Sequence, residues 1–257
     1  MALLALLQPD ARGLARVREA LRAHHELVEC SSWRALVEAV RDRPIQVCII
    51  DLYHPTSPVS TDDLGTLVDS RPDVAVLVYS DFSERPTELY RLGQAHVDAV
   101  IMAGFDDNTR QIQEATTKAL SAAVATRVAR SLEGRVLGLE LEALLWSAEN
   151  ALSRPRVADL AVALGVSPWQ LARGLRGTGV SSARQVLLWG RLFQGGRLLG
   201  EPQATVEKVA FRLGYSSDAA FRRALRDNVG YAPTDVIRRG GLECVLEGFL
   251  DGRMTKS

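Results

Sequence analysis

Two stretches in the second half of the chain indicate its fold: LAVALGVSPWQLARGL at residues 160–175 and VAFRLGYSSDAAFRRAL at residues 209–225. Ala161 and Gly165 of the first recur in the second as Ala210 and Gly214, 49 positions later. Past the glycine the offset becomes 50, and it relates Ser167, Leu171, Arg173 and Leu175 to Ser217, Phe221, Arg223 and Leu225. The second copy therefore has one more residue in its turn.

Each copy has the local signals of two short helices joined by a tight turn. The glycine suits a positive φ, the serine suits an N-cap, and Pro168 suits the first position of a helix. Two short helices joined by a glycine-containing turn form a helix-turn-helix. A second copy in register, about 50 residues on, is much harder to obtain by chance than a single one.

The segment between the copies, residues 182–199, is expected to be one helix. At about 1.5 Å per residue it would be roughly 27 Å long. That length suits two recognition helices in successive major grooves, which lie about 34 Å apart. Gly190, Gly195 and Gly196 each weaken this helix by about 1 kcal/mol, and the expected compensation is close packing of the two units against it.

The two copies and the segment between them resemble the DNA-binding domain of the AraC/XylS family over about residues 140–238. The resemblance rests on Leu160, Ala161, Leu164, Gly165, Val166, Ser167, Leu171, Arg173, Leu175, Arg191, Leu192, Leu198, Leu199, Val209, Ala210, Leu213, Gly214, Tyr215, Phe221, Arg222, Arg223, Leu225, Gly230 and Pro233. Gly195, where the family has a slightly larger small residue, and Leu225, where Phe is commoner, depart from the pattern but keep its apolar character. The resemblance implies an all-α, seven-helix double helix-turn-helix domain in a transcription regulator.

We expect Leu171, Leu175, Phe221 and Leu225 in the cores of the two units and the opposite helix faces on DNA. Residues early in a recognition helix reach base edges, where Arg suits guanine and Gln suits adenine. The expected DNA-facing residues are Trp169, Gln170 and Arg173 in the first unit, and Ser217, Asp218, Ala219, Arg222, Arg223 and Arg226 in the second. The resemblance implies DNA contacts for six of these: Trp169, Arg173, Asp218, Ala219, Arg222 and Arg223. The alternatives are a solvated cation or a phosphate contact for each Arg, and core packing for Trp169.

The first half reads as a doubly wound α/β domain, because short apolar runs alternate with helical periodicity. Strands are expected at residues 2–7, 47–52, 74–79 and 99–102, and helices at residues 11–24, 33–41, 61–70, 84–93 and 109–130. In such sheets the functional crevice lies at the carboxyl ends of the strands.

The run Ile49-Ile50-Asp51-Leu52-Tyr53-His54-Pro55 resembles the third strand of response-regulator receiver domains. The resemblance implies a flavodoxin-like parallel sheet, a phosphoacceptor at Asp51 and a switch residue at Ser80. The first strand, however, is followed by Gln8 and a single Asp10 where receivers have two adjacent carboxylates, and Ala103 stands in place of the receiver lysine.

These departures weaken both sources of positive charge at the receiver site. Phosphoryl transfer needs positioned positive charge, and Mg²⁺ is normally held by one or two carboxylates. We therefore expect a domain that works without phosphorylation, and no metal or cofactor. Two interpretations of Asp51 stay open: a phosphoacceptor, or a strand-end residue that caps a loop.

Charge and composition add bounds to this interpretation. Residues 1–125 have 18 acidic and 12 basic side chains, and residues 126–257 have 13 acidic and 19 basic, so only the second half has a basic surplus. The three cysteines have no metal-ligand spacing and suit a reducing cytoplasm. No apolar run approaches the roughly 18 residues of a membrane span, so no membrane partner is expected. The first ten residues read as a strand and not as a signal peptide.

The sequence thus predicts a cytoplasmic regulator with a receiver-like domain at residues 1–131, a DNA-binding domain at residues 132–240 and a tail at residues 241–257. The expected partner is double-stranded promoter DNA, with homodimerisation and a protein or small-molecule signal at the receiver-like domain left open. Two rival functions remain: a response regulator controlled by phosphorylation of Asp51, and an interaction module whose helix-turn-helix domain does not read DNA. An enzyme is the least expected, because no catalytic groups converge.

Overall fold

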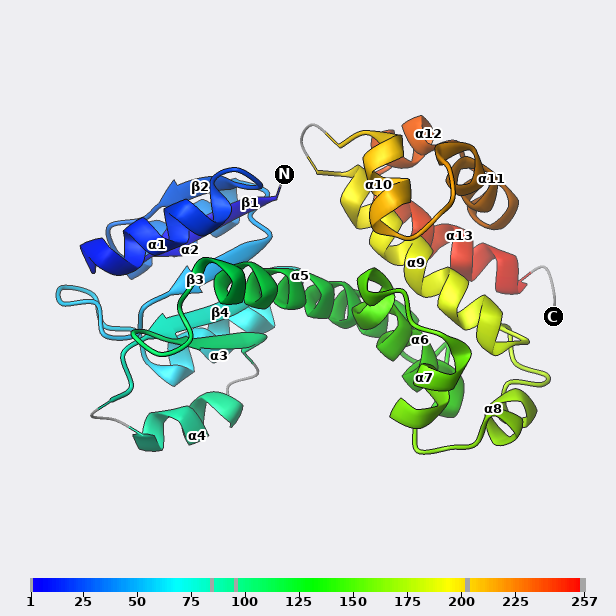
Figure 1. Ribbon diagram of the computed structural model, residues 1–257, viewed down its shortest axis with the longest axis horizontal. Coiled ribbons are helices and arrows are strands. Elements are labelled where there is room, and N and C mark those ends of the chain that lie inside the picture. Colours follow the sequence, from blue (N-terminus) through cyan, green and yellow to red (C-terminus); the bar gives the residue numbers. More distant parts are fainter. Residues whose placement is uncertain (1, 84–85, 95–96, 202–203, 255–257) are drawn as a thin grey trace. The chain divides into compact units, whose positions relative to one another are not determined.

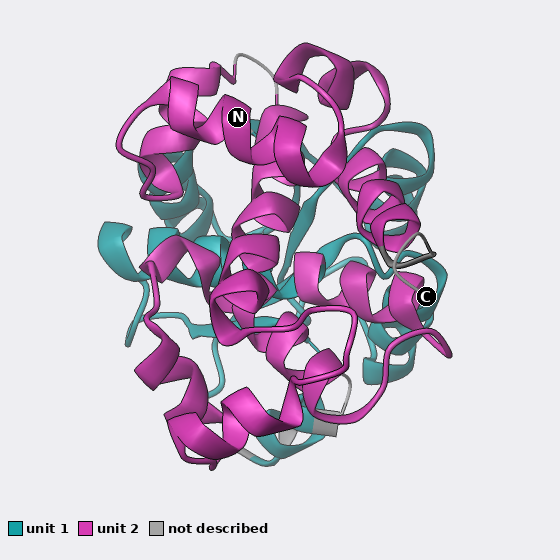
Figure 2. Cartoon of the chain, turned by 90° about the vertical axis from the view of Figure 1, so that its right-hand side faces the viewer, with its two compact units in different colours: residues 1–123 teal, residues 124–257 magenta. Residues whose placement is uncertain are grey.

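The computed structural model describes residues 2–83, 86–94, 97–201 and 204–254, whose helices and strands are labelled in Figure 1. The chain forms two compact units, Met1–Ala123 and Val124–Ser257, which Figure 2 shows in different colours. The division falls inside one helix. The domain boundaries expected from the sequence, after residues 131 and 240, remain predictions.

The first unit is built on five parallel strands in the order β2-β1-β3-β4-β5. The strands are β1 (Leu3–Leu7), β2 (Glu26–Glu29), β3 (Val47–Ile50), β4 (Ala75–Ser80) and β5 (Ala99–Met102). This is the flavodoxin-like order of doubly wound sheets, so the expected fold class is confirmed. Strand β2 was not expected, because this edge strand has the sequence ELVE, with two exposed glutamates and no fully buried residue.

Helices cover both faces of the sheet (Figure 1). They are α1 (Ala11–Leu21), α2 (Trp33–Asp42), α3 (Thr61–Ser70), α4 (Pro86–Gln94) and α5 (Thr109–Leu132). Apolar residues of α1 and α5 pack with one face of the strands, and those of α2, α3 and α4 pack with the other. The helix expected at residues 84–93 is α4, and residues 84 and 85 lie outside the described part of the chain.

Four of these helices begin where a polar side chain caps them, among them α5, where Asn108 accepts from the Gln111 amide over 3.0 Å. Asp10 accepts a hydrogen bond from the Gly13 backbone, and Ser32 accepts one from Ala35. Ser60 and Asp63 form a reciprocal capping box at the start of α3. Each cap satisfies an amide that the helix itself leaves without a partner, so these residues fix where the helices start.

The second unit is helical. Its α-helices are α6 (Gly138–Asn150), α7 (Val157–Ala163), α8 (Pro168–Gly174), α9 (Ala183–Leu199), α10 (Val206–Arg212), α11 (Asp218–Val229), α12 (Pro233–Arg238) and α13 (Leu242–Met254), with a 3₁₀ turn η1 (Ala151–Ser153). Among the described residues, α6 to α12 are the seven helices that the resemblance implied. No helix in the described part of the chain is long and apolar enough to span a bilayer.

The tail forms α13, which packs within the second unit. Cys244, Val245, Leu246 and Phe249 are all buried. The Phe249 ring meets the Trp189 ring of α9 edge-on, with centroids 4.8 Å apart. The apolar residues of the tail are therefore part of this core.

The last turns of α5 also belong to the second unit. Val124, Val128 and Leu132 lie in the same apolar cluster as the cores of α6 to α13. Arg127 forms an ion pair with Glu243 of α13 at 2.8 Å. Ala119 and Ala123, earlier in the same helix, pack in the first unit. One helix thus supplies core residues to both units.

Candidate functional site

The turn between α7 and α8 has the geometry that its sequence predicts. Gly165 adopts φ +65°, and the Val166 amide donates to the Ala161 carbonyl over 3.0 Å. Ser167 accepts from the Gln170 amide over 3.2 Å, and its own amide donates to Oε1 of Gln170 over 2.8 Å. This reciprocal box fixes the start of α8, with Pro168 at its first positions.

The turn between α10 and α11 repeats that geometry. Gly214 adopts φ +77°, and the Tyr215 amide donates to the Ala210 carbonyl over 3.0 Å. Ser217 caps α11 by accepting from the Ala220 amide over 3.1 Å. The extra residue, Ser216, lies between the glycine turn and the cap, so the sequence repeat corresponds to a structural repeat.

Both helix-turn-helix motifs bury the residues that were expected in their cores. Leu171, Leu175, Phe221 and Leu225 have no exposed surface. This burial fixes which faces of α8 and α11 point outward, since residues on the opposite face of a helix follow from its period.

The outward face of α8 has an aromatic ring beside an arginine. Trp169 is 64% exposed, so it lies on the surface and not in the core. The Arg173 guanidinium lies over its ring, 5.3 Å from the centroid. A guanidinium held on an aromatic face is oriented before it meets a ligand, which lowers the entropy cost of using it. Gln170 is also exposed, but its Oε1 is engaged in the helix cap.

The outward face of α11 is rich in arginine. Arg222, Arg223 and Arg226 are exposed, as is Ala219. Asp218, at the first position of the helix, pairs with Arg222 one turn on, with Oδ2 and Nε 3.2 Å apart. Both side chains are more than two-fifths exposed, so the pair orients Arg222 more than it stabilises the helix.

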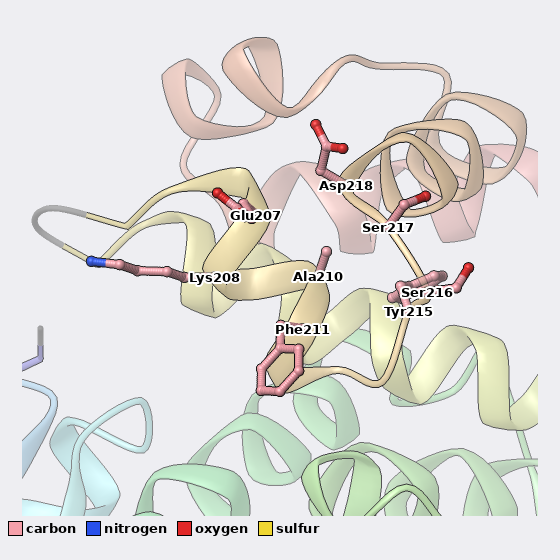
Figure 3. A pocket seen from close by; sticks show the side chains of 8 residues that line it. All are labelled: Glu207, Lys208, Ala210, Phe211, Tyr215, Ser216, Ser217 and Asp218. Carbon is pink, nitrogen blue, oxygen red and sulfur yellow. The ribbon is translucent and has the colours of Figure 1, made fainter.

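A surface hollow of about 730 Å³ lies beside the start of α11 (Figure 3). Its lining comes from α10, from the turn and from the first residues of α11: Glu207, Lys208, Ala210, Phe211, Tyr215, Ser216, Ser217 and Asp218. Two of these side chains are carboxylates and one is a lysine, so the charge around the hollow does not favour a phosphate.

Within the second unit, helix α9 packs closely through its glycines, as expected from the sequence, against α6, α11 and the start of α13. A Cβ on Gly190 would lie 2.2 Å from Ser147 Oγ of α6, and one on Gly195 would lie 3.0 Å from the Phe221 ring of α11. One on Gly196 would meet Leu242 Cα, at the start of α13, at 2.9 Å. The 17 residues of α9 span roughly 25 Å. Both helix-turn-helix motifs therefore pack along one helix, and the length of that helix suits the spacing of successive major grooves.

In the first unit, Asp51 and Ser80 lie together at the carboxyl ends of β3 and β4. Ser80 Oγ donates to Asp51 Oδ1 over 2.7 Å and accepts from the Leu52 amide over 2.9 Å. The Tyr53 amide also donates to Asp51 Oδ1, over 3.1 Å. This is next to the point between β1 and β3 where the strand order reverses, the usual crevice of such sheets. The two residues that the resemblance indicated, Asp51 and Ser80, are thus hydrogen-bonded to each other.

The surroundings of Asp51 do not fit a magnesium site. Asp10 caps α1 through the Gly13 amide. The Gln8 side chain is engaged by the Tyr79 carbonyl and the Asp10 amide. In the described part of the chain, no three His, Cys, Asp or Glu side chains are grouped so that they could hold a metal ion.

A network on the face of the sheet covered by α1 and α5 was not expected from the sequence; Asp107 and Tyr79 are buried in it, and Arg16 is half-exposed. Asp107, before α5, accepts from the Tyr79 hydroxyl over 2.9 Å and from the Gly104 amide over 2.8 Å, and it also pairs with Arg16 of α1. Burial alone would raise the pKa of Asp107, but these hydrogen bonds and the Arg16 charge outweigh it, so the pKa is lowered. Burial and then the Asp107 carboxylate raise the pKa of Tyr79 to about 12. The network joins α1, β4 and the segment before α5.

Comparisons with known proteins gave a family match and several similar solved structures. Residues 160–239 match the family model described as "Helix-turn-helix domain". A comparison with curated proteins gave no match. Similar solved structures include a response regulator from Thermotoga maritima, with 15% identity, a TM-score of 0.41, and coverage of 47% of this chain and 98% of that one.

Two further structures are a CheY-like receiver domain protein from Methanospirillum hungatei JF-1 and NtrX from Brucella abortus in complex with ADP. The first has 16% identity and a TM-score of 0.41, and covers 48% of this chain and 96% of that one. The second has 17% identity and a TM-score of 0.45, and covers 59% of this chain but only 34% of that one. Residues 160–239 of this protein are thus a helix-turn-helix domain of the AraC type, and they follow an α/β unit whose five parallel strands have the flavodoxin-like order.

Proposed function

We propose that the protein is a transcription regulator that binds promoter DNA with α8 and α11. The observation that supports this best is the repeat itself: two capped helices, each with a buried apolar face and an exposed polar face, packed on one helix of suitable length. An interaction module would need neither the repeated caps nor this spacing.

Within this proposal, α8 reads bases and α11 supplies general affinity. Arg173 is held by Trp169 close to the capped start of α8, where base edges are in reach. The Oε1 atom of Gln170 is engaged in the cap, which leaves its amide NH₂ as a donor to DNA. Bidentate reading of adenine needs both groups, so Arg173 is the main base reader of this helix.

On α11, Arg222, Arg223 and Arg226 neutralise phosphates whatever the sequence is. Asp218 repels the backbone at close approach and orients Arg222. Ala219 offers a methyl group to a thymine methyl, and the Ser217 hydroxyl, although it caps the helix, can still donate to a phosphate oxygen.

We further propose that the α/β unit works without phosphorylation of Asp51. One oxygen of Asp51 is already satisfied by Ser80 and by the Tyr53 amide. Gln8 and Ala103 supply neither the carboxylate nor the cation that phosphoryl transfer needs. Such a unit would respond to a protein or a small molecule bound in the cytoplasm, or to homodimerisation.

The DNA proposal is tested by titrating the full chain against fluorescent duplexes selected by the protein from a random pool. Affinity should fall steeply between 50 and 200 mM salt, because phosphate neutralisation releases counterions (roughly 10³-fold for about six phosphate contacts). Scrambled duplexes should bind more weakly than selected ones. If no duplex binds at low salt, or binding ignores salt, the interaction module becomes the better account.

The phosphorylation proposal is tested by intact mass after incubation with acetyl phosphate and Mg²⁺. The mass should not change. A gain of one phosphoryl group that is lost in Asp51→Asn, while Asp10→Asn keeps it, would instead assign the protein to the regulators controlled through Asp51.

A further inference from the structure

Arg154 has an unusual backbone. It lies between η1 and α7, in the segment that leads into the first helix-turn-helix, and it adopts φ +57°. Among the described residues it is the one non-glycine with positive φ. A residue with a Cβ adopts this left-handed conformation at a cost, so contacts of the side chain must hold it there.

Those contacts reach the second helix-turn-helix. Nη2 of Arg154 donates to the Phe211 carbonyl over 2.6 Å, and the guanidinium lies 5.5 Å from the centroid of the Phe211 ring. The aliphatic stem crosses the turn, since a Cβ on Gly214 would lie 2.8 Å from Arg154 Cδ. Figure 3 shows Phe211 projecting from α10 beside this turn. Phe211 lies in the last turn of α10, and its carbonyl, which also accepts from the Gly214 amide over 3.1 Å, lies at the negative end of the helix dipole, where a cation is favoured.

Helix α9 by itself leaves one freedom between the two motifs. Gly190 brings α6, the helix before the first motif, against it and Gly195 brings α11 of the second motif, so α9 fixes the separation of these helices along its axis. The apolar cores of both motifs pack with α9 in one cluster, but contacts close to an axis resist rotation about it less than a contact farther out does. The contact between Arg154 and Phe211 lies away from the axis and therefore restrains that rotation.

We propose that Arg154 is a positioning residue that sets the rotation of the second helix-turn-helix relative to the first. This inference rests on the proposed DNA binding. Since α8 and α11 bind the two half-sites in that proposal, Arg154 also sets which spacing of half-sites the protein accepts. When two linked units bind one DNA, the second event is intramolecular, and a stiff link concentrates it at one geometry. A looser link lowers affinity at that geometry and tolerates others.

The test measures the affinity of the full-length wild type and of full-length Arg154→Gly for two duplexes: the selected site, and the same site with one base pair inserted between the half-sites. Glycine tolerates the positive φ, so the variant loses the side chain without new backbone strain. Arg239→Ala is the matched control, because Arg239 is also exposed and lies 4.3 Å from the centroid of an aromatic ring, that of Tyr231, but joins neighbouring segments only.

One inserted base pair moves the second half-site by about 3.4 Å and rotates it by about 34°. The full chain and Arg239→Ala should lose about tenfold in affinity on the inserted duplex, whereas Arg154→Gly should lose less than about threefold. Arg154→Gly should also bind the selected site more weakly. If Arg154→Gly keeps the tenfold ratio, Arg154 does not set the spacing.

A second measurement needs no DNA. Spin labels on Ala172→Cys of α8 and Asp227→Cys of α11, in a chain with Cys30→Ser, report the distance between the two motifs. The distance distribution should broaden in Arg154→Gly and stay narrow in Arg239→Ala. If the wild-type chain binds no duplex, the proposed function fails, and the width of the distance distribution alone tests the positioning role of Arg154. A width that is unchanged in Arg154→Gly overturns that role.

Discussion

Replacing Gly190 by alanine should destabilise the second unit, although alanine favours a helix. The new Cβ would lie 2.2 Å from Ser147 Oγ and 2.5 Å from the Ser147 carbonyl oxygen. Contacts under 3.0 Å essentially never occur for a Cβ, and the carbonyl belongs to the backbone of α6, so the two helices must separate. Overpacking of this kind costs about 3 kcal/mol, and the gain in helix propensity returns about 1 kcal/mol.

The expected net loss is about 2 kcal/mol, or roughly 6–8 °C in the melting temperature of a unit of this size. Scanning calorimetry of the full chain measures it. Gly65→Ala in α3 is the control, because nothing lies within 4 Å of its new Cβ, and it should stabilise the first unit by about 0.5–1 kcal/mol. If Gly190→Ala melts at or above the wild-type temperature, the close approach of α6 and α9 is not what the glycine provides.

Three further predictions follow from the site and the core. Arg173→Ala should cost about 1–3 kcal/mol of binding free energy on selected DNA and little on scrambled DNA, whereas Arg226→Ala should weaken binding to both alike and lower the salt slope by about one. Titrations at two salt concentrations measure both effects. If Arg173→Ala loses equal affinity on the two DNAs, Arg173 does not read bases. The pKa of Asp107 is lowered in the folded protein, so Asp107 stabilises the fold above its unfolded pKa of about 3.9, and this stabilisation is lost as the pH falls through the folded value. Between pH 7 and pH 3, the free energy of unfolding in urea should therefore fall more for the wild type than for Asp107→Asn. Equal losses would contradict this. The fragment 124–257 should melt several degrees above the fragment 132–257, which lacks two core valines worth about 1.5–3 kcal/mol each, and equal melting would exclude those turns from the core.

The parts of the fold that local signals determine could be predicted from the sequence. The glycine and serine of each turn, with Pro168 in the first, have one conformational use each, so both helix-turn-helix motifs could be located to the residue. The glycines of α9 also indicated close packing. Strand β2 could not be predicted, because its pairing with β1 supplies the stability that its sequence lacks.

Contacts made over long distances in the sequence were harder to predict. The Asp107 network joins residues 91 positions apart, and Arg154 reaches a carbonyl 57 positions away. The available signal for the Asp107 network was Tyr79, because a buried tyrosine hydroxyl in a strand must find a hydrogen-bond partner. No local signal points to Arg154, because nothing in its neighbourhood requires a left-handed residue.

Helix α5 limits how such proteins can recombine during evolution. Because Ala123 packs in one core and Val124 in the other, no loop offers a clean breakpoint between the two parts. A single residue inserted between them would keep the residues of each core in register with one another, but it would turn one part by about 100° about the helix axis relative to the other, whereas seven residues would turn it by only about 20°. Fusions that keep the orientation of a new N-terminal domain relative to this helical unit should therefore differ in the length of this helix by multiples of seven residues.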